Sequence, residues 1–105
     1  MLIAEIRESV SLIEGYTAGQ TADSFRSNMM MRDAVCMRLI VIGEAANRLT
    51  GETMARIPDL NWRGMAGLRH LLAHDYGSAS PSLLWSIVSG SLPGLADALT
   101  RFGED

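Results

Sequence analysis

The middle of this chain carries a long segment, residues 28–49, that contains no turn signal and is apolar on nearly all sides at its centre. The central run, Cys36-Met-Arg-Leu-Ile-Val-Ile, is rich in β-branched residues and taken alone could be a buried strand. Both flanks consist of helix formers, so the whole segment is predicted to be one helix of about six turns. A helix with two apolar faces needs two neighbours, and because the chain is short, one of them could belong to a second copy.

Shorter patterns predict the helices around this central one. Apolar residues at three- and four-residue spacing indicate helices over residues 2–16, 62–76, 81–88 and 92–102. A loop over residues 17–23, with Thr21 or Asp23 as a capping residue, is expected to lead into a short helical turn around Phe25. Together these segments predict an all-α fold, an antiparallel bundle of four or five helices.

Capping residues and helix breakers set the expected boundaries in the second half of the chain. Asn61 is suited to cap the helix that starts at Trp62, and Ser80-Pro81 to begin the next one. Residues 50–53 are expected to end the central helix, and Ser89-Gly-Ser to break the chain between the last two helices.

The size and charge of the chain limit what it can do. Its 105 residues, 48% of them hydrophobic and 20% charged, fit a single domain over residues 1–105 and exclude a disordered acidic tail or a disulfide-framed mini-protein. With a net charge of −3 the chain lacks the global positive field that drives sequence-independent binding of nucleic acids. Any phosphate must therefore be bound locally, and every basic residue available for this is an arginine.

The sequence also indicates a cellular compartment. Cys36 is the single cysteine and is expected to be a buried structural thiol in a reducing compartment. The N-terminus does not resemble a signal peptide, and the longest strongly apolar run, Leu39 to Ile42, is far shorter than the roughly 20 residues of a membrane span. A cytoplasmic protein without a membrane partner is expected.

Chemically capable side chains concentrate in residues 67–77, which contain both histidines of the chain. Five of them fall within eight residues: Arg69, His70, His74, Asp75 and Tyr76. A lone Arg or His near a helix end often only complements the helix dipole, but five together are harder to explain in this way. The His70/His74 spacing could place two imidazoles on one zinc ion, but only Asp75 is near enough to be a third ligand, so no metal and no cofactor are expected.

The spacing of these residues indicates how they could work together. Arg69 and His74 lie about 140° apart around a regular helix, whereas Arg69 and Tyr76 lie within about 20° of each other. A single helix would therefore not aim all three side chains at one atom. Two copies related by a two-fold axis could enclose a cleft in which each group occurs twice.

The segment around Arg69 resembles a known family. Arg69-x-x-x-x-His74-x-Tyr76 is similar to the R-x4-H-x-Y motif of the HEPN superfamily, and His70 is a residue type accepted after the arginine. The surroundings resemble the HepT-like branch from Phe25 to Leu99. The matching segments occur in the expected order: Arg32-Asp-Ala-Val, Ile42-Gly-Glu-Ala-Ala, Ile57-Pro-x-Leu-Asn-Trp-Arg, Gly67-Leu-Arg and Ala73-His-Asp-Tyr.

This resemblance implies a fold and a function. It implies a HEPN-like helical domain that forms a homodimer and acts as the ribonuclease toxin of a type VII toxin–antitoxin system. The partner would be a minimal nucleotidyltransferase antitoxin. In HepT-like toxins this partner attaches AMP to the motif tyrosine, and the matching position here is Tyr76.

Two functions from different classes follow. The first is metal-independent endonucleolytic RNA cleavage, in which His74 acts as acid or base and Arg69 holds the phosphate, with His70, Asp75 and Tyr76 supporting them. The second is a non-catalytic helical module that binds a nucleotide or docks a nucleotidyltransferase, which the low positive charge favours. A third possibility is that Arg69 and His74 only cap a helix end. The intact Arg69/His74 pair favours the nuclease.

Overall fold

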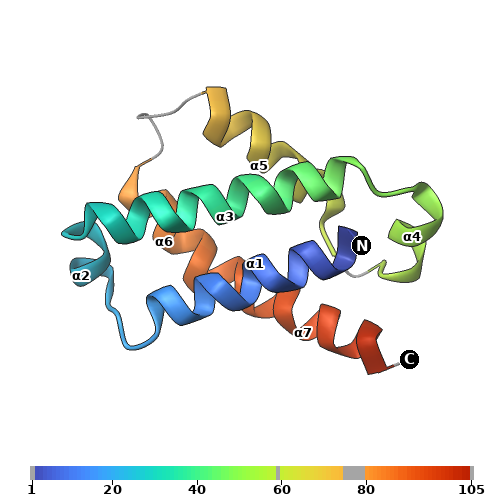
Figure 1. Cartoon of the computed structure of the whole chain (residues 1–105), viewed down its shortest axis with the longest axis horizontal. Helices are drawn as coiled ribbons and strands as arrows, with labels where there is room; N and C mark the ends of the chain where they lie inside the picture. The colour runs from blue at the N-terminus through green and yellow to red at the C-terminus, as the bar shows by residue number, and fades with distance from the viewer. Residues whose placement is uncertain (1, 59, 75–79, 105) are drawn as a thin grey trace.

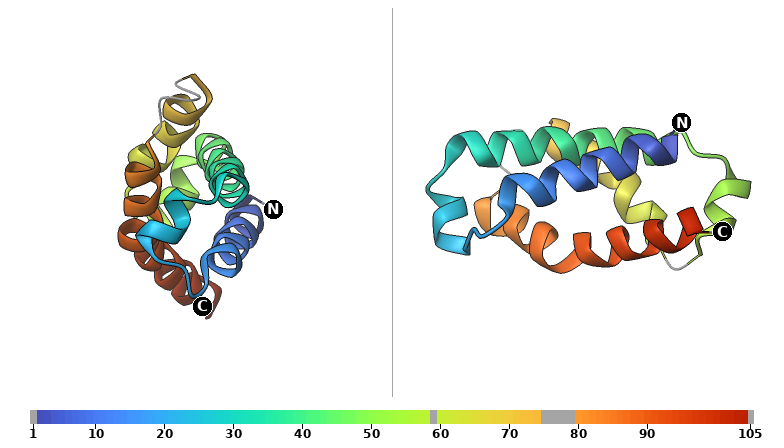
Figure 2. Two further views of the ribbon diagram at one scale, coloured as in Figure 1. Left: turned by 90° about the vertical axis from the view of Figure 1, so that its left-hand side faces the viewer. Right: turned by 60° about the horizontal axis from the view of Figure 1, so that its bottom comes forward.

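The computed structural model describes residues 2–58, 60–74 and 80–104, and for residues 69–71, 73–74 and 102–104 the description covers the backbone alone. Within these residues the chain contains helices and no strand, which confirms the predicted all-α fold. The end-on view in Figure 2 shows two layers, with α1 (Leu2–Thr17) and α3 (Met29–Asn47) on one side and the later helices on the other.

The central helix is the scaffold of the fold. α3 covers 19 residues, begins after Asn28, whose side chain accepts a hydrogen bond from the Met31 backbone N–H at 3.0 Å, and contains the β-branched run without a break. α1 and α5 (Trp62–His74) both pack against it (Figure 1). The two neighbours that the sequence predicted for α3 are thus both supplied by the same chain, and the dimer stays a prediction.

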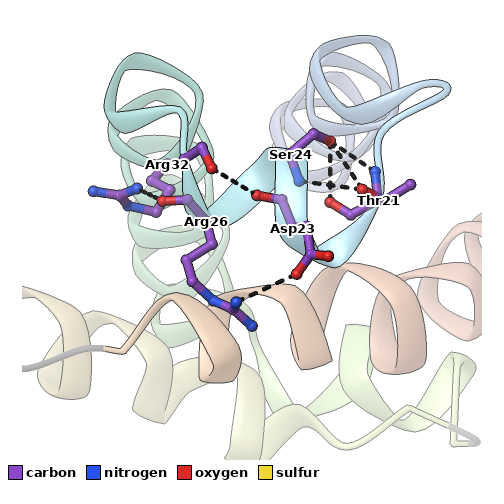
Figure 3. Close-up of polar contacts among 6 residues, drawn as sticks. Thr21, Asp23, Ser24, Arg26 and Arg32 are labelled. Atoms are coloured by element: carbon purple, nitrogen blue, oxygen red, sulfur yellow. Dashed lines mark hydrogen bonds and ion pairs between the residues drawn. The ribbon is translucent and has the colours of Figure 1, made fainter.

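A capping box starts the short helix α2 (Ala22–Arg26). Thr21 and Ser24 exchange hydrogen bonds between side chain and backbone at 3.1 and 2.8 Å (Figure 3). This confirms the expected helical turn around Phe25. The Phe25 ring is fully buried, and its centroid lies 5.2 Å from the ring centroid of Trp85. The α2 segment thereby anchors one end of the molecule to the core.

The prediction that residues 50–53 only terminate the central helix is wrong. The helix ends at Asn47, and Thr50 caps a separate helix, α4 (Gly51–Arg56), by accepting a hydrogen bond from the Thr53 backbone N–H at 3.1 Å. A Thr-Gly pair fits the end of one helix and the start of another equally well. Formation of a separate helix here also depends on Trp62. Its indole N–H donates to the Met54 and Ile57 carbonyls at 3.0 and 2.9 Å.

The predicted break at Ser89-Gly-Ser is also absent. α6 (Pro81–Ser86) begins with the predicted Ser80 cap and runs through a π-helical turn, η1 (Ile87–Ser91), into α7 (Leu92–Glu104). Pro93 stands two residues after the end of this turn, and a proline inside a helix crowds the carbonyl four residues earlier and lacks an N–H. The extra residue of a π-turn is a recognised way to accommodate such a perturbation.

One hydrophobic core joins these elements. Its fully buried side chains come from several helices and include Ile6, Ile13, Phe25, Val35, Leu39, Ile42, Leu72 and Leu99. None of the helices in the described part of the chain has both the length and the apolar character that crossing a membrane requires.

Candidate functional site

The predicted site residues lie at the C-terminal end of α5 and just beyond it. Asn61 begins this helix as predicted, with its side-chain oxygen accepting from the Gly64 backbone N–H at 3.0 Å. The backbone positions of Arg69, His70 and His74 fall on the last two turns. Asp75 and Tyr76 lie outside the described residues.

The orientation of α5 is fixed by its apolar side. Met65 and Leu72 are buried and Leu68 is partly buried against the core, and their spacing of three and four residues places them on one face of the helix. Around a regular helix the position of Arg69 lies about 60° from that of Leu72, and the position of His74 about 160° from it. His74 thus occupies a position on the side of the helix away from the core, and Arg69 one at the edge of the packed side.

The helix is continuous between the two motif positions, so their five-residue spacing corresponds to about 140° around one axis, as predicted. One copy of α5 therefore presents Arg69 and His74 at well-separated angles. One phosphate can contact both groups only if the long Arg69 side chain extends around the helix, or if the arginine or the histidine comes from a second chain.

The place of α5 in the fold is set by α3. The Asn47 amide donates to the Ala66 carbonyl at 3.4 Å, which joins the end of α3 to the first half of α5. α5 then runs back along α3 in the opposite direction, so that its C-terminal end lies over the middle of α3 (Figure 1). The motif is thus carried by a helix that packs on the central helix of the fold.

Cys36, in the middle of α3, is not an activated nucleophile. Partial burial and, to a smaller extent, the nearby Asp33 carboxylate raise the pKa of its thiol above the ordinary value. A raised pKa keeps the sulfur in its unreactive thiol form near neutral pH. The unreactive thiol agrees with the structural role expected for Cys36, but the side chain is only partly buried and not buried as the sequence predicted.

The side chains in the described part form no cluster of three His, Cys, Asp or Glu residues that could hold a metal ion. Both histidines fall outside that set, so this observation does not test the His70/His74 spacing.

A groove that the sequence did not indicate lies between the first half of α5 and α7. Its volume is about 510 Å³, and its floor is formed by Leu39 and Ile42 of α3. Its lining residues come from α3, α5, η1 and α7 and from the residues just before α5, and for this reason no local pattern in the sequence reveals it.

The chain is similar to one family of known proteins. Residues 6–102 match the family model described as Ribonuclease HepT-like. A protein of Methanocaldococcus jannaschii, provisionally named an RNase, is 34% identical over 89 residues, which cover 85% of this chain and 82% of that protein. A protein of Thermococcus cleftensis, provisionally named ribonuclease HepT, is 30% identical over 93 residues, which cover 89% of this chain and 84% of that protein.

One relative is much longer. Another Methanocaldococcus jannaschii protein, whose name combines gamma-glutamylcyclotransferase with a provisional RNase, is 32% identical over 100 residues. The match covers 95% of this chain but only 45% of that protein. No solved structure gives a significant match to the chain.

Proposed function

This chain belongs to the ribonuclease HepT-like family, and from that premise we propose that it is a metal-independent endoribonuclease, the toxin of a type VII toxin–antitoxin system. The observation that carries the proposal is the complete Arg69-x-x-x-x-His74-x-Tyr76 motif within the matched residues. The positions of Arg69 and His74 stand on one continuous helix, which contacts the core through Met65, Leu68 and Leu72.

RNA supplies its own nucleophile, which explains why so few protein groups are needed. The 2′-oxygen attacks the adjacent phosphorus and loses its proton to a base, while the bond from phosphorus to the 5′-oxygen breaks and that oxygen takes up a proton. We assign one of these proton transfers to His74, because imidazole titrates near neutral pH. Arg69 holds the phosphate and stabilises the charge that develops on it.

Each cleavage moves two protons, whereas one chain contributes one His74. We therefore propose a homodimer in which two copies of the α5 C-terminal end face one cleft, so that one His74 acts as base and the other as acid. His70 and Asp75 would orient Arg69 or His74, and Tyr76 would contact the phosphate or stack on a base. The expected location is the cytoplasm, where the RNA substrate is found.

Alanine substitutions test the assignment. Arg69→Ala and His74→Ala should each abolish RNA cleavage and any growth arrest, because each removes a group that acts in the transition state. Arg63→Ala is a matched control, since Arg63 is an exposed arginine on the first turn of the same helix. Cleavage of labelled RNA by purified protein is the measurement, with circular dichroism to confirm that each variant folds.

Chelation tests metal independence in the same assay. Cleavage by the wild type should continue in EDTA. Loss of cleavage in EDTA with recovery on added zinc or magnesium would replace this mechanism with a metal-dependent one.

The partner that we propose is a minimal nucleotidyltransferase that attaches AMP to Tyr76. A phosphate on this tyrosine would add bulk and negative charge close to the Arg69 side chain, where an RNA phosphate must bind. Tyr76→Phe should therefore keep nuclease activity but escape neutralisation by the partner. Intact-mass measurement after incubation with the partner and ATP is decisive: AMP on the Phe variant would show that another residue is the acceptor.

The second candidate function is a non-catalytic module that binds a nucleotide or docks the nucleotidyltransferase. The net charge of −3 favours it, because a polyanion is held weakly by such a chain. If the chain binds RNA or a nucleotide without cleaving it, and His74→Ala leaves that binding unchanged, the result would support the binding module and not the nuclease.

A further inference from the structure

The exposed large apolar side chains in the described part of the chain gather on α3. Five such residues are exposed, and three of them are methionines of this helix: Met29, Met30 and Met37, which are 66%, 82% and 54% exposed. Met30 and Met37 are seven residues apart, which places them within about 20° of each other around a regular helix and about 10 Å apart along its axis. One side of α3 therefore presents thioether side chains to solvent.

Met31 stands next in the chain and provides a direct comparison. It lies about 100° from Met30 around the helix, on the side that packs into the core, and is 8% exposed. Met65 on α5 is buried to a similar extent, with 9% exposed. The fold thus separates exposed from buried methionines, although Met29, Met30 and Met31 are consecutive in the sequence.

A thioether in contact with water is open to a two-electron oxidation. A sulfur lone pair attacks one oxygen of a hydroperoxide, so that a sulfur–oxygen bond forms while the oxygen–oxygen bond breaks. With hydrogen peroxide, the departing oxygen takes up the proton of the attacked oxygen and leaves as water. The sulfur is oxidised to a sulfoxide and the peroxide is reduced. Because the thioether carries no proton to lose, access to solvent decides which methionine reacts.

We propose that Met29, Met30 and Met37 form a reversible oxidation site, at which hydroperoxides convert exposed thioethers to sulfoxides while the core stays intact. Each sulfoxide stays hydrated at the surface, so this side of α3 changes from apolar to polar without a polar group entering the core. A methionine sulfoxide reductase reverses the change: a dithiol becomes a disulfide, and the sulfoxide oxygen leaves as water. This site does not depend on the proposed nuclease.

The oxidation rates of individual methionines test the assignment. Hydrogen peroxide is added to the folded protein, and samples taken over time are digested with trypsin and analysed by tandem mass spectrometry. Cleavage after arginines places residues 27–32 in one peptide and residues 33–38 in another, and fragment ions separate the three methionines of the first peptide. Met30 should oxidise at least about tenfold faster than Met31, because only Met30 is open to solvent. Met37 should exceed Met65 by a similar factor.

Unfolding supplies the matched control for these rates, since it removes burial and leaves the sequence unchanged. In concentrated urea Met30 and Met31 should oxidise at equal rates. A large difference that persists in urea would show that local sequence, and not the fold, selects the site, and it would overturn the proposal.

The change in surface polarity is measured on the folded protein. Protein oxidised at the exposed methionines should elute earlier from a hydrophobic-interaction column, keep its far-UV circular dichroism spectrum and its urea midpoint, and return to its first elution position after treatment with the reductase. The triple variant Met29→Leu, Met30→Leu and Met37→Leu lacks the three exposed sulfurs. It should fold like the wild type and keep its elution position in peroxide.

Three further results would overturn the proposal. The first is equal oxidation of Met30 and Met31 in the folded protein, and the second is a lower urea midpoint after oxidation of the exposed set. The third is protection of Met30 and Met37 when the protein is concentrated, because a second copy would then cover this side of α3. None of these measurements involves RNA cleavage, so a failure of this proposal is distinguishable from a failure of the proposed nuclease.

Discussion

At the scale of single residues, local chemistry explains most positions that the sequence identified. Asn61 and Ser80 cap helices as predicted, because an N-cap depends on residues within one turn of it. Ser9 is different. It is fully buried on α1, and its hydroxyl has no hydrogen-bond partner in the described part of the chain. In the sequence Ser9 stands between Glu8 and Val10 and gives no sign of burial, and only packing against other helices shows the cost of burying its hydroxyl.

Replacing Ser9 should raise stability. A buried hydroxyl without a partner costs about 1–3 kcal/mol, and Ser9→Ala removes it while leaving almost the same volume. We expect the free energy of unfolding in urea to rise by about 0.5–2 kcal/mol. Ser11→Ala, at an exposed position on the same helix, is the control and should change it little. A loss of stability in Ser9→Ala would show that the hydroxyl is bonded in solution.

At the scale of elements, the sequence located the long helices but misjudged two junctions. Periodicity over several turns defines α1 and α5, and helix-forming flanks without a turn signal define α3. α4 and η1 each cover only one to two turns, and neither is stable by its own propensity. α4 is held from outside by Trp62, and η1 joins two helices that are each packed on the core.

Trp62→Phe tests this account of α4. The phenyl ring keeps most of the apolar contact but cannot donate to the Met54 and Ile57 carbonyls. We expect a loss of about 1–2 kcal/mol in unfolding free energy and faster hydrogen exchange at the amides of α4. Amides of α6, which lies outside this contact, serve as the internal control. Unchanged exchange in α4 would mean that the Thr50 cap alone holds the helix.

At the scale of the whole molecule, a single core joins helices that are distant in the sequence. The Arg7 guanidinium donates to the Leu99 carbonyl at 3.0 Å, which ties the first helix to the last. Phe25 and Trp85 join α2 to α6. Because these contacts share one core, we expect the molecule to unfold in one cooperative step.

Phe25→Ala should weaken the entire molecule and not only α2. Removing a fully buried phenylalanine costs about 3–5 kcal/mol, which is a large part of the roughly 5–15 kcal/mol that stabilises a small domain. The midpoint of urea unfolding should move to a lower urea concentration, and by the same amount whether it is measured by far-UV circular dichroism or by tryptophan fluorescence. Phe25→Leu should lose less, because it leaves a smaller cavity. A shift seen by only one of the two probes would contradict a single core.

The sequence by itself determined the all-α fold, the place of the long helices and their caps, and the motif that identifies the family. Each of these depends on residues within one or two helical turns, or on fixed spacing along the chain. Only the tertiary structure decided that α1 and α5 cover α3, that α4 exists, that α6 continues through η1 into α7, and that a groove separates α5 from α7. These features depend on contacts between segments far apart in the chain, which no local pattern encodes.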